Sequence, residues 1–187
     1  MRAEPVAYVP KRQPDVAEPW RCFGADEETY ERWAPHVCGI CCLKMVGDTL
    51  GRTTDLSLHE LTVMCVDRGG FRVNADDTIE GVFHHPLAAL GNDLGIPSRV
   101  APGVDVAQAR SVVAESGFVL FSVDLARFDQ RLRGGHLLLL HDYLPAADEF
   151  VLHDCSSAVG QPGRDVRLTS AVLARIGNNK GLIVDPS

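Results

Sequence analysis

The order of the hydrophobic patterns along the chain constrains its fold more than any other feature. Before residue 117 the apolar residues recur at spacings of three and four, which is typical of helices, and after it they form short continuous runs, which indicate buried strands. Helices in the first half and strands in the second favour an α+β fold over alternating βαβ units. We therefore expect a helical part packed on a C-terminal antiparallel sheet.

The expected elements are bounded by capping residues, glycines and prolines. The helices are expected at 26–33, 38–50, 57–67, 86–94, 106–116 and 169–176. The strands are expected at 118–123, 136–143, 149–154 and 181–184, with a hairpin joining the second to the third, and the polar segment 71–79 is expected to be a loop. Prolines interrupt residues 1–20, which predicts an extended arm, and residues 21–187 are expected to form one domain.

Charge and composition exclude several classes of function. The chain has 18 basic and 25 acidic residues and a formal charge of −7, which argues against a nucleic-acid surface. It contains neither a secretory signal pattern nor an apolar stretch long enough to enter a membrane. We expect a cytoplasmic protein whose six cysteines are thiols, and the oligomeric state is left open.

Three residues stand in settings that suit a catalytic triad. Cys38 begins a predicted helix, whose free amides and dipole lower the pKa of a thiol. His136 opens a predicted strand, and Asp154 ends the next one. Because the two strands are expected to pair in antiparallel fashion, the carboxylate can orient the imidazole, and the imidazole can serve the thiol as a general base.

Two glycines border these candidates. Gly39 follows the cysteine, where it lets a substrate backbone approach and leaves the amide of Cys38 open to an oxyanion. Gly135 precedes the histidine and keeps the surroundings of the ring free of side chains.

The sequence resembles the papain-like bacterial cysteine peptidases related to the double-glycine leader peptidases of bacteriocin exporters. The resemblance is carried by Trp33, by Cys38-Gly39-Ile40-Cys41-Cys42-Leu43-Lys44-Met45-Val46, by Gly134-Gly135-His136-Leu137-Leu138-Leu139-Leu140 and by Val151-Leu152-His153-Asp154. It implies a papain-like fold, Cys38 as nucleophile, His136 as general base and acid, Asp154 as orienting residue, and Gly39, Trp33 and Gly135 as oxyanion or substrate contacts.

The chain departs from that family at two positions. Arg32 stands six residues before the cysteine, where the leader peptidases have an oxyanion-hole glutamine, and Cys155 stands where a proline usually follows the aspartate. The resemblance therefore implies a cysteine peptidase that hydrolyses a peptide bond through a thioester, and leaves two alternatives. One is an acyltransferase or cyclase that tailors a peptide natural product with the same triad, and the other is a non-catalytic peptide-binding module.

Other uses of these residues are weaker. Cys38 and Cys41 have the CxxC spacing of thiol oxidoreductases and zinc sites, but no strand precedes them and no second ligand pair follows. His84 and His85 could be ligands or substrate contacts, and a solvated pair is favoured. His141 is expected on the opposite face of its strand from His136. We expect no metal and no cofactor, and a peptide or acyl group as the substrate.

Overall fold

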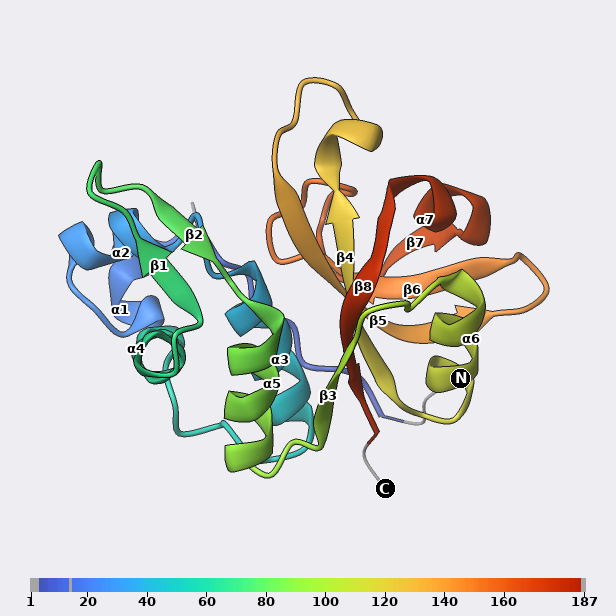
Figure 1. Cartoon of the computed structure of the whole chain (residues 1–187), viewed down its shortest axis with the longest axis horizontal. Coiled ribbons are helices and arrows are strands. Elements are labelled where there is room, and N and C mark those ends of the chain that lie inside the picture. The colour runs from blue at the N-terminus through green and yellow to red at the C-terminus, as the bar shows by residue number, and fades with distance from the viewer. Residues whose placement is uncertain (1–3, 14, 186–187) are drawn as a thin grey trace.

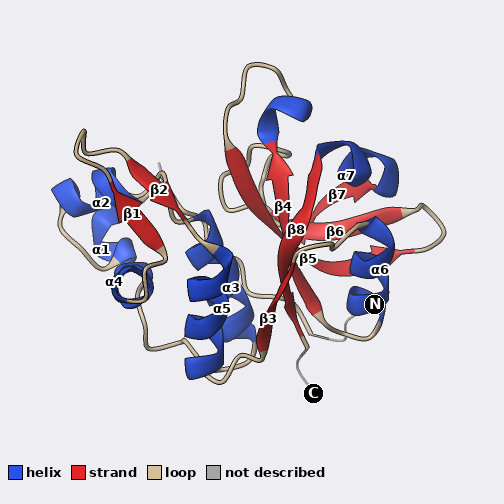
Figure 2. Ribbon diagram, in the orientation of Figure 1, coloured by secondary structure: helices blue, strands red, loops and turns tan. Residues whose placement is uncertain are grey.

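The computed structural model describes residues 4–13 and 15–185, which form a helical half beside a sheet half (Figure 1, Figure 2). The helical half consists of α1 (Pro19–Phe23), α2 (Glu27–Trp33), α3 (Cys38–Thr49), α4 (Leu58–Asp67), β1 (Phe71–Val73), β2 (Ile79–Gly81) and α5 (His84–Asp93). The sheet half consists of β3 (Ser98–Ala101), α6 (Val106–Ala114), β4 (Phe118–Asp124), the 3-10 turn η1 (Leu125–Arg127), β5 (Gly135–Leu144), β6 (Glu149–His153), β7 (Val166–Thr169), α7 (Ser170–Ile176) and β8 (Gly177–Val184). The expected α+β arrangement is confirmed.

The sheet separates two hydrophobic cores. Its six strands lie in the order β3-β8-β4-β5-β6-β7, and every neighbouring pair is antiparallel. Successive side chains of β5 point to opposite faces, so Leu137 and Leu139 join the core under α3, whereas Leu138 and Leu140 join the core under α6 and α7. A strand buried on both faces reads as an unbroken apolar run, which is what the sequence shows there.

The α3 helix lies at the centre of the molecule, between β5 on one side and α4 and α5 on the other. Ile40, Leu43 and Val46 are fully buried, and so are Cys41 and Cys42. A helix buried on nearly all sides is held rigidly by close packing, and its first residue is held with it.

Most predicted elements are confirmed. Ser57 caps α4 in the predicted capping box with Glu60. Asp26, which was expected inside the first turn of its helix, is the capping residue of α2 instead. β5 and β6 pair across the expected hairpin, although a bulge between Leu140 and Asp142 shifts their register.

The prediction of a loop at 71–79 is wrong, because this segment contains most of a two-stranded hairpin of β1 and β2. A turn joins the two strands, with Asp77 at φ 65° and the amide of Asn74 donating to the carbonyl of Thr78 at 2.9 Å. Strands of three residues are too short to show a periodicity.

The sequence also missed the edges of the larger sheet. β3 and β7 are four-residue edge strands of mixed polarity that show no apolar run. β8 begins at Gly177 rather than at Gly181, because its register with β4 shifts and the polar residues Asn178, Asn179 and Lys180 lie within the irregularity.

The described residues of the N-terminal arm before Pro19 contain no helix and no strand, and the arm ends at Glu18 rather than at residue 20. The α1 helix begins at Pro19, because proline is tolerated in the first turn of a helix. Residues 1–3 and 14 of the predicted arm lie outside the described residues. Within the described part of the chain, no helix combines the length and the apolar character that crossing a bilayer requires.

The capping box at α4 gives a prediction of stability. We expect Ser57→Ala to lower the free energy of unfolding by about 1 kcal/mol, because the amide of Glu60 loses its acceptor and the Glu60 carboxylate loses the bond from the Ser57 hydroxyl. Chemical denaturation measures the change. Ser111→Ala is the matched control, because Ser111 is exposed within α6 and its hydroxyl only donates back to Ala107; equal losses in both variants would contradict the assignment.

Candidate active site

Cys38 occupies the first position of α3, after the capping residue Val37. Its amide has no acceptor inside the helix, as for every residue of a first helical turn, and the positive end of the helix dipole lies at its thiol. The side chain is partly exposed, whereas the five residues that follow it, from 39 to 43, are buried. The thiol is thus fixed in position and open to the surface.

His136 lies near the start of β5, where the strand pairs with Val123 of β4. Gly134, two residues earlier, has φ 88°, a conformation that favours glycine and lets the loop turn into the strand. The imidazole is buried, and its Nε2 donates a hydrogen bond to Asp154 Oδ1 at 2.8 Å. The other ring nitrogen is left for the thiol of Cys38, with which His136 also interacts.

Asp154 follows β6 and is completely buried. Besides the imidazole, its carboxylate accepts the amide and hydroxyl of Ser156, at 2.9 and 2.8 Å, and the amide of Val159, at 2.9 Å. A buried carboxylate is tolerated only with such a set of partners.

The backbone around Asp154 is held from two sides. Its amide donates to the carbonyl of Gly163 at 2.7 Å, and its carbonyl accepts the hydroxyl of Tyr8 at 3.2 Å. The arm adds a bond from the amide of Lys11 to the carbonyl of Cys155 at 3.0 Å. A side chain at Gly163 would place its Cβ 2.0 Å from the carbonyl oxygen of Asp154, so only glycine fits there.

The three groups shift one another toward their charged forms. Burial opposes ionisation of Cys38, but the hydrogen bond and the charge of His136 outweigh burial and hold the pKa of this thiol below its ordinary value. Burial also opposes protonation of His136, and the hydrogen bonds to Asp154 and Cys38 overcome it and raise the pKa to about 10. Burial raises the pKa of Asp154, yet the bond from His136 and the backbone amides bring it well below its usual range. The favoured state is a thiolate beside an imidazolium.

The other cysteines near the site have the opposite character. Burial raises the pKa of Cys42 well above the ordinary value, and the bond with Cys41 together with burial does the same for Cys155. All six cysteines are free thiols. Among these buried neighbours, Cys38 is distinguished by its lowered pKa and its access to solvent.

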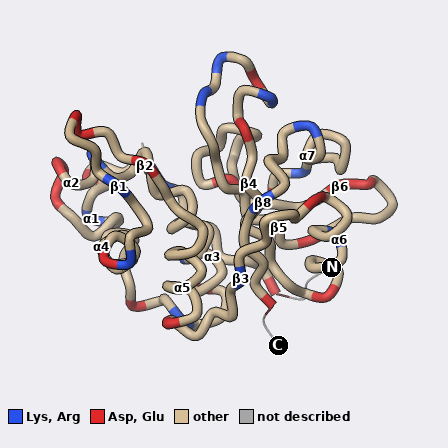
Figure 3. The backbone as a smooth tube through the Cα atoms, in the orientation of Figure 1, with Lys and Arg blue, Asp and Glu red and all other residues tan. Residues whose placement is uncertain are grey.

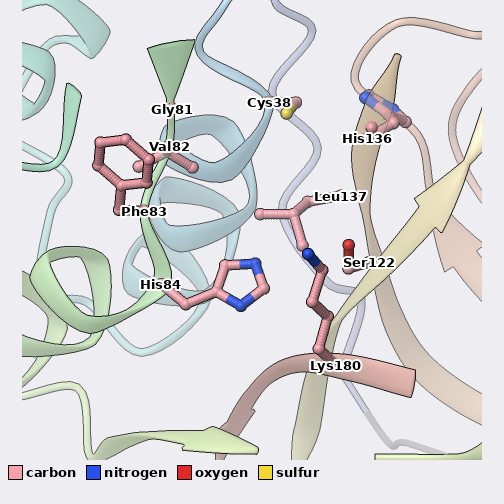
Figure 4. A pocket seen from close by; sticks show the side chains of 10 residues that line it. Cys38, Gly81, Val82, Phe83, His84, Ser122, His136, Leu137 and Lys180 are labelled. Carbon is pink, nitrogen blue, oxygen red and sulfur yellow. The ribbon is translucent and has the colours of Figure 1, made fainter. Parts of the chain in front are cut away.

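A cleft of about 240 Å³ opens beside the thiol, between the helical and the sheet halves (Figure 4). Its lining residues are Cys38, Gly81, Val82, Phe83, His84, Ser122, Gly135, His136, Leu137 and Lys180. A second hollow of about 640 Å³ shares Val82, Phe83, His84 and Lys180 with it and extends to Val100 and Pro102. The two hollows are therefore neighbours, and together they are called the groove below.

Lys180 gives this groove a positive charge. It projects from the irregular start of β8, and Figure 4 shows its ammonium group between His84 and Ser122. Basic and acidic residues are otherwise interspersed over the molecule (Figure 3), and most arginines pair with a carboxylate. No ion pair of Lys180 is found within the described residues, and the groove lining contains no carboxylate.

The structure brings Cys38, His136 and Asp154 together, and it places the accompanying residues as follows. Gly135 lines the cleft, and a Cβ there would meet nothing nearer than 3.9 Å. Gly39 is buried under Val82, whose Cγ1 lies 2.2 Å from the position of a Cβ, so its lack of a side chain serves packing. Trp33 packs edge-on against Phe71, with the ring centroids 5.4 Å apart.

Arg32, at the position of the family's glutamine, forms an ion pair with Asp77 in the turn of the β1–β2 hairpin. Sequence reasoning missed this pairing, because the hairpin itself was not predicted. It also missed Ser156, which contacts both His136 and Asp154. It missed Lys180 as well, because the polar residues around Lys180 show no apolar run from which the start of β8 could be predicted. The hydroxyl two residues after the aspartate was the available signal for Ser156.

Comparison with known proteins identifies the fold. No protein-family model and no curated protein match the chain. Among solved structures, the peptidase domain of Streptococcus ComA, a bifunctional ABC transporter involved in quorum sensing, aligns with a TM-score of 0.57 at 14% identity, over 82% of this chain and 93% of that domain. A C39-like peptidase from Bacillus anthracis aligns with a TM-score of 0.56 at 14% identity, over 79% and 87%.

A double-glycine motif protease from an AMS/PCAT transporter, solved in complex with a leader peptide, aligns with a TM-score of 0.51 at 14% identity, over 80% of this chain and 84% of that one. These likenesses extend over most of both chains, so they concern the whole fold rather than a shared motif. The expected papain-like α+β fold is confirmed, and it is the fold of the double-glycine leader peptidase domains.

Proposed function

We propose that the chain is a cysteine peptidase that cleaves a peptide bond through a thioester on Cys38. The observation that supports this most is the hydrogen-bonded series from the thiol through His136 to the buried Asp154, at the mouth of a cleft. The fold shared with peptidase domains agrees with it.

The proposed reaction follows from the charges of the three groups. The thiolate of Cys38 attacks the carbonyl carbon of the scissile bond, and the proton on His136 passes to the leaving amine as the C–N bond breaks. A water molecule then gives a proton to His136 and attacks the thioester, which releases the carboxylic acid and the thiolate. Asp154 keeps the ring oriented throughout through its bond to Nε2.

The oxyanion that forms during attack requires hydrogen-bond donors. The amide of Cys38 is proposed as one, because it has no acceptor within α3. Arg32 is not proposed as the second, because its guanidinium is paired with Asp77. This pairing is the observation that favours the alternative of a non-catalytic peptide-binding module, and the acyltransferase alternative differs from hydrolysis only in whether an amine replaces the water.

The activated thiol is tested by alkylation. We work in a Cys22→Ser background, because Cys22 is an exposed thiol, and expect rapid labelling by iodoacetamide at pH 7 that Cys38→Ala abolishes. The labelling rate should fall as the pH decreases. The inflection of this curve should lie below the pKa of an ordinary thiol, because His136 lowers the pKa of Cys38.

The second variant for this test is His136→Ala, which should slow labelling at pH 7 by about tenfold or more, since the thiolate loses its partner. If the labelling rate plotted against pH has the inflection of a free thiol, and if His136→Ala does not change it, the result favours the non-catalytic module. Cleavage of a peptide library, followed by mass spectrometry, then distinguishes hydrolysis from transfer to an added amine. Cleavage that persists in Cys38→Ala would contradict the proposal.

The groove suggests which peptides are preferred. Lys180 carries a charge with no carboxylate in the lining around it, so an Asp or Glu side chain of the bound peptide is the fitting partner. The irregularity at the start of β8 directs the side chain of Lys180 into the groove, as bulges near active sites commonly do.

We expect a peptide with Glu in the groove to be cleaved with a kcat/KM about fivefold higher than that of its Gln counterpart. This ratio corresponds to an ion pair that contributes about 1 kcal/mol. Lys180→Met should remove this preference and Lys180→Glu should reverse it. The control is Arg175→Met, which alters an exposed cation on α7. An unchanged Glu-to-Gln ratio in Lys180→Met would rule out this role.

We further propose a cytoplasmic location, supported by the six free thiols.

A further inference from the structure

Two buried histidines and an aspartate gather outside the cleft, at the β6–β7 end of the sheet. His141 comes from β5, His153 is the last residue of β6, and Asp165 immediately precedes β7. The two rings are in contact, with their centroids 4.4 Å apart. The proposed reaction uses none of the three residues.

Their ligand atoms face a common point. His141 Nε2 lies 3.4 Å from Asp165 Oδ1, His153 Nδ1 lies 3.7 Å from the same oxygen, and all three atoms lie within 4.8 Å of one another. Ligands at 2.0–2.1 Å from a tetrahedral zinc ion are about 3.4 Å apart. The two spacings between a histidine nitrogen and the carboxylate oxygen are therefore close to those of a zinc site, and the third spacing, between the two rings, is at most 4.8 Å.

The backbone holds His153 in the form that binds a metal. Its Nε2 donates to the carbonyl of Val6 at 3.2 Å, which leaves Nδ1 as the nitrogen with the lone pair. A bond from the second ring nitrogen to a carbonyl is the usual support of a metal-binding histidine.

Nδ1 of His153 accepts the amide of Asp165 at 3.0 Å, and a metal ion would have to displace this bond. The displacement is feasible because Asp165 lies in a loop and its side chain is 56% exposed. Only Oδ1 faces the histidines, since Oδ2 lies 3.6 Å from Nε of Arg164. The exposed side leaves a coordination position for water.

We propose that His141, His153 and Asp165 form a zinc site with nitrogen and oxygen ligands and one water. The site connects β5, β6 and the loop before β7, and one of its ligands directly precedes Asp154. Bound zinc stabilises this corner of the sheet, from which the triad carboxylate projects. The expectation of no metal site came from the spacing of the cysteines, whereas this site is formed by two histidines and an aspartate that lie on different elements.

The test uses the full chain with Cys22→Ser and Cys38→Ala, which removes the exposed thiol and the thiol of the cleft. We expect calorimetric titration with Zn²⁺ to give one ion per chain, and X-ray absorption to show nitrogen and oxygen neighbours without sulfur. The sulfur criterion separates this site from a second group, His136, Asp154 and Cys155, whose ligand atoms also lie within 4.8 Å of one another and which would bind zinc through a thiolate.

Asp165→Asn should weaken zinc binding about tenfold or more, because a charged ligand is lost while the left-handed backbone, at φ 50°, still suits asparagine. Asp77→Asn is the matched control, because Asp77 is also an exposed aspartate with a positive φ and an arginine partner. His141→Gln should abolish binding, with circular dichroism checking that it folds. The proposal is overturned if zinc does not bind, if it binds through sulfur, or if it binds Asp165→Asn as tightly as the parent. These outcomes do not depend on the peptidase activity.

Discussion

The arrangement of the candidate site depends on one buried pair, the imidazole of His136 and the carboxylate of Asp154. Removing both from water costs free energy that their mutual attraction repays only if the remaining lone pairs are also satisfied. Ser156 and Val159 supply these donors, and Gly163 and Tyr8 hold the backbone. The loop after β6 thus has a sequence adapted to one carboxylate, and loss of any of these contacts leaves part of a buried charge without a partner.

The two halves of the molecule supply different parts of the site. The helical half contributes the thiol, at the tip of a helix that packing holds on nearly every side. The sheet half contributes His136, Asp154 and Lys180. Because Cys38 begins α3 and His136 lies in β5, the position of the thiol relative to the imidazole depends on the packing of α3 against β5.

The residues explain which parts could be predicted. Long elements with a strong pattern, such as α3 and β5, and the capping box at Ser57 could be predicted because local chemistry alone determines them. The three residues of the candidate site could be predicted because each lies at the end of such an element. The hairpin at Phe71 to Gly81, the edge strands and the bulge at Lys180 were missed, since their structure comes from partners distant in sequence. The histidine–aspartate cluster was missed for the same reason, because its members meet only through the pairing of β5, β6 and β7.

The N-terminal arm bears on the order of folding. Its bonds join Val6 to His153 and Tyr8 to Asp154, which are 147 and 146 positions apart along the chain. During synthesis the arm is made well before the imidazole of His153 and the carbonyl of Asp154 that anchor it. Closing so long a loop costs entropy, which is recovered only once β6 is in place. The arm therefore docks only after β6 and the loop that holds Asp154 have been synthesised, although the arm itself is made earlier than both.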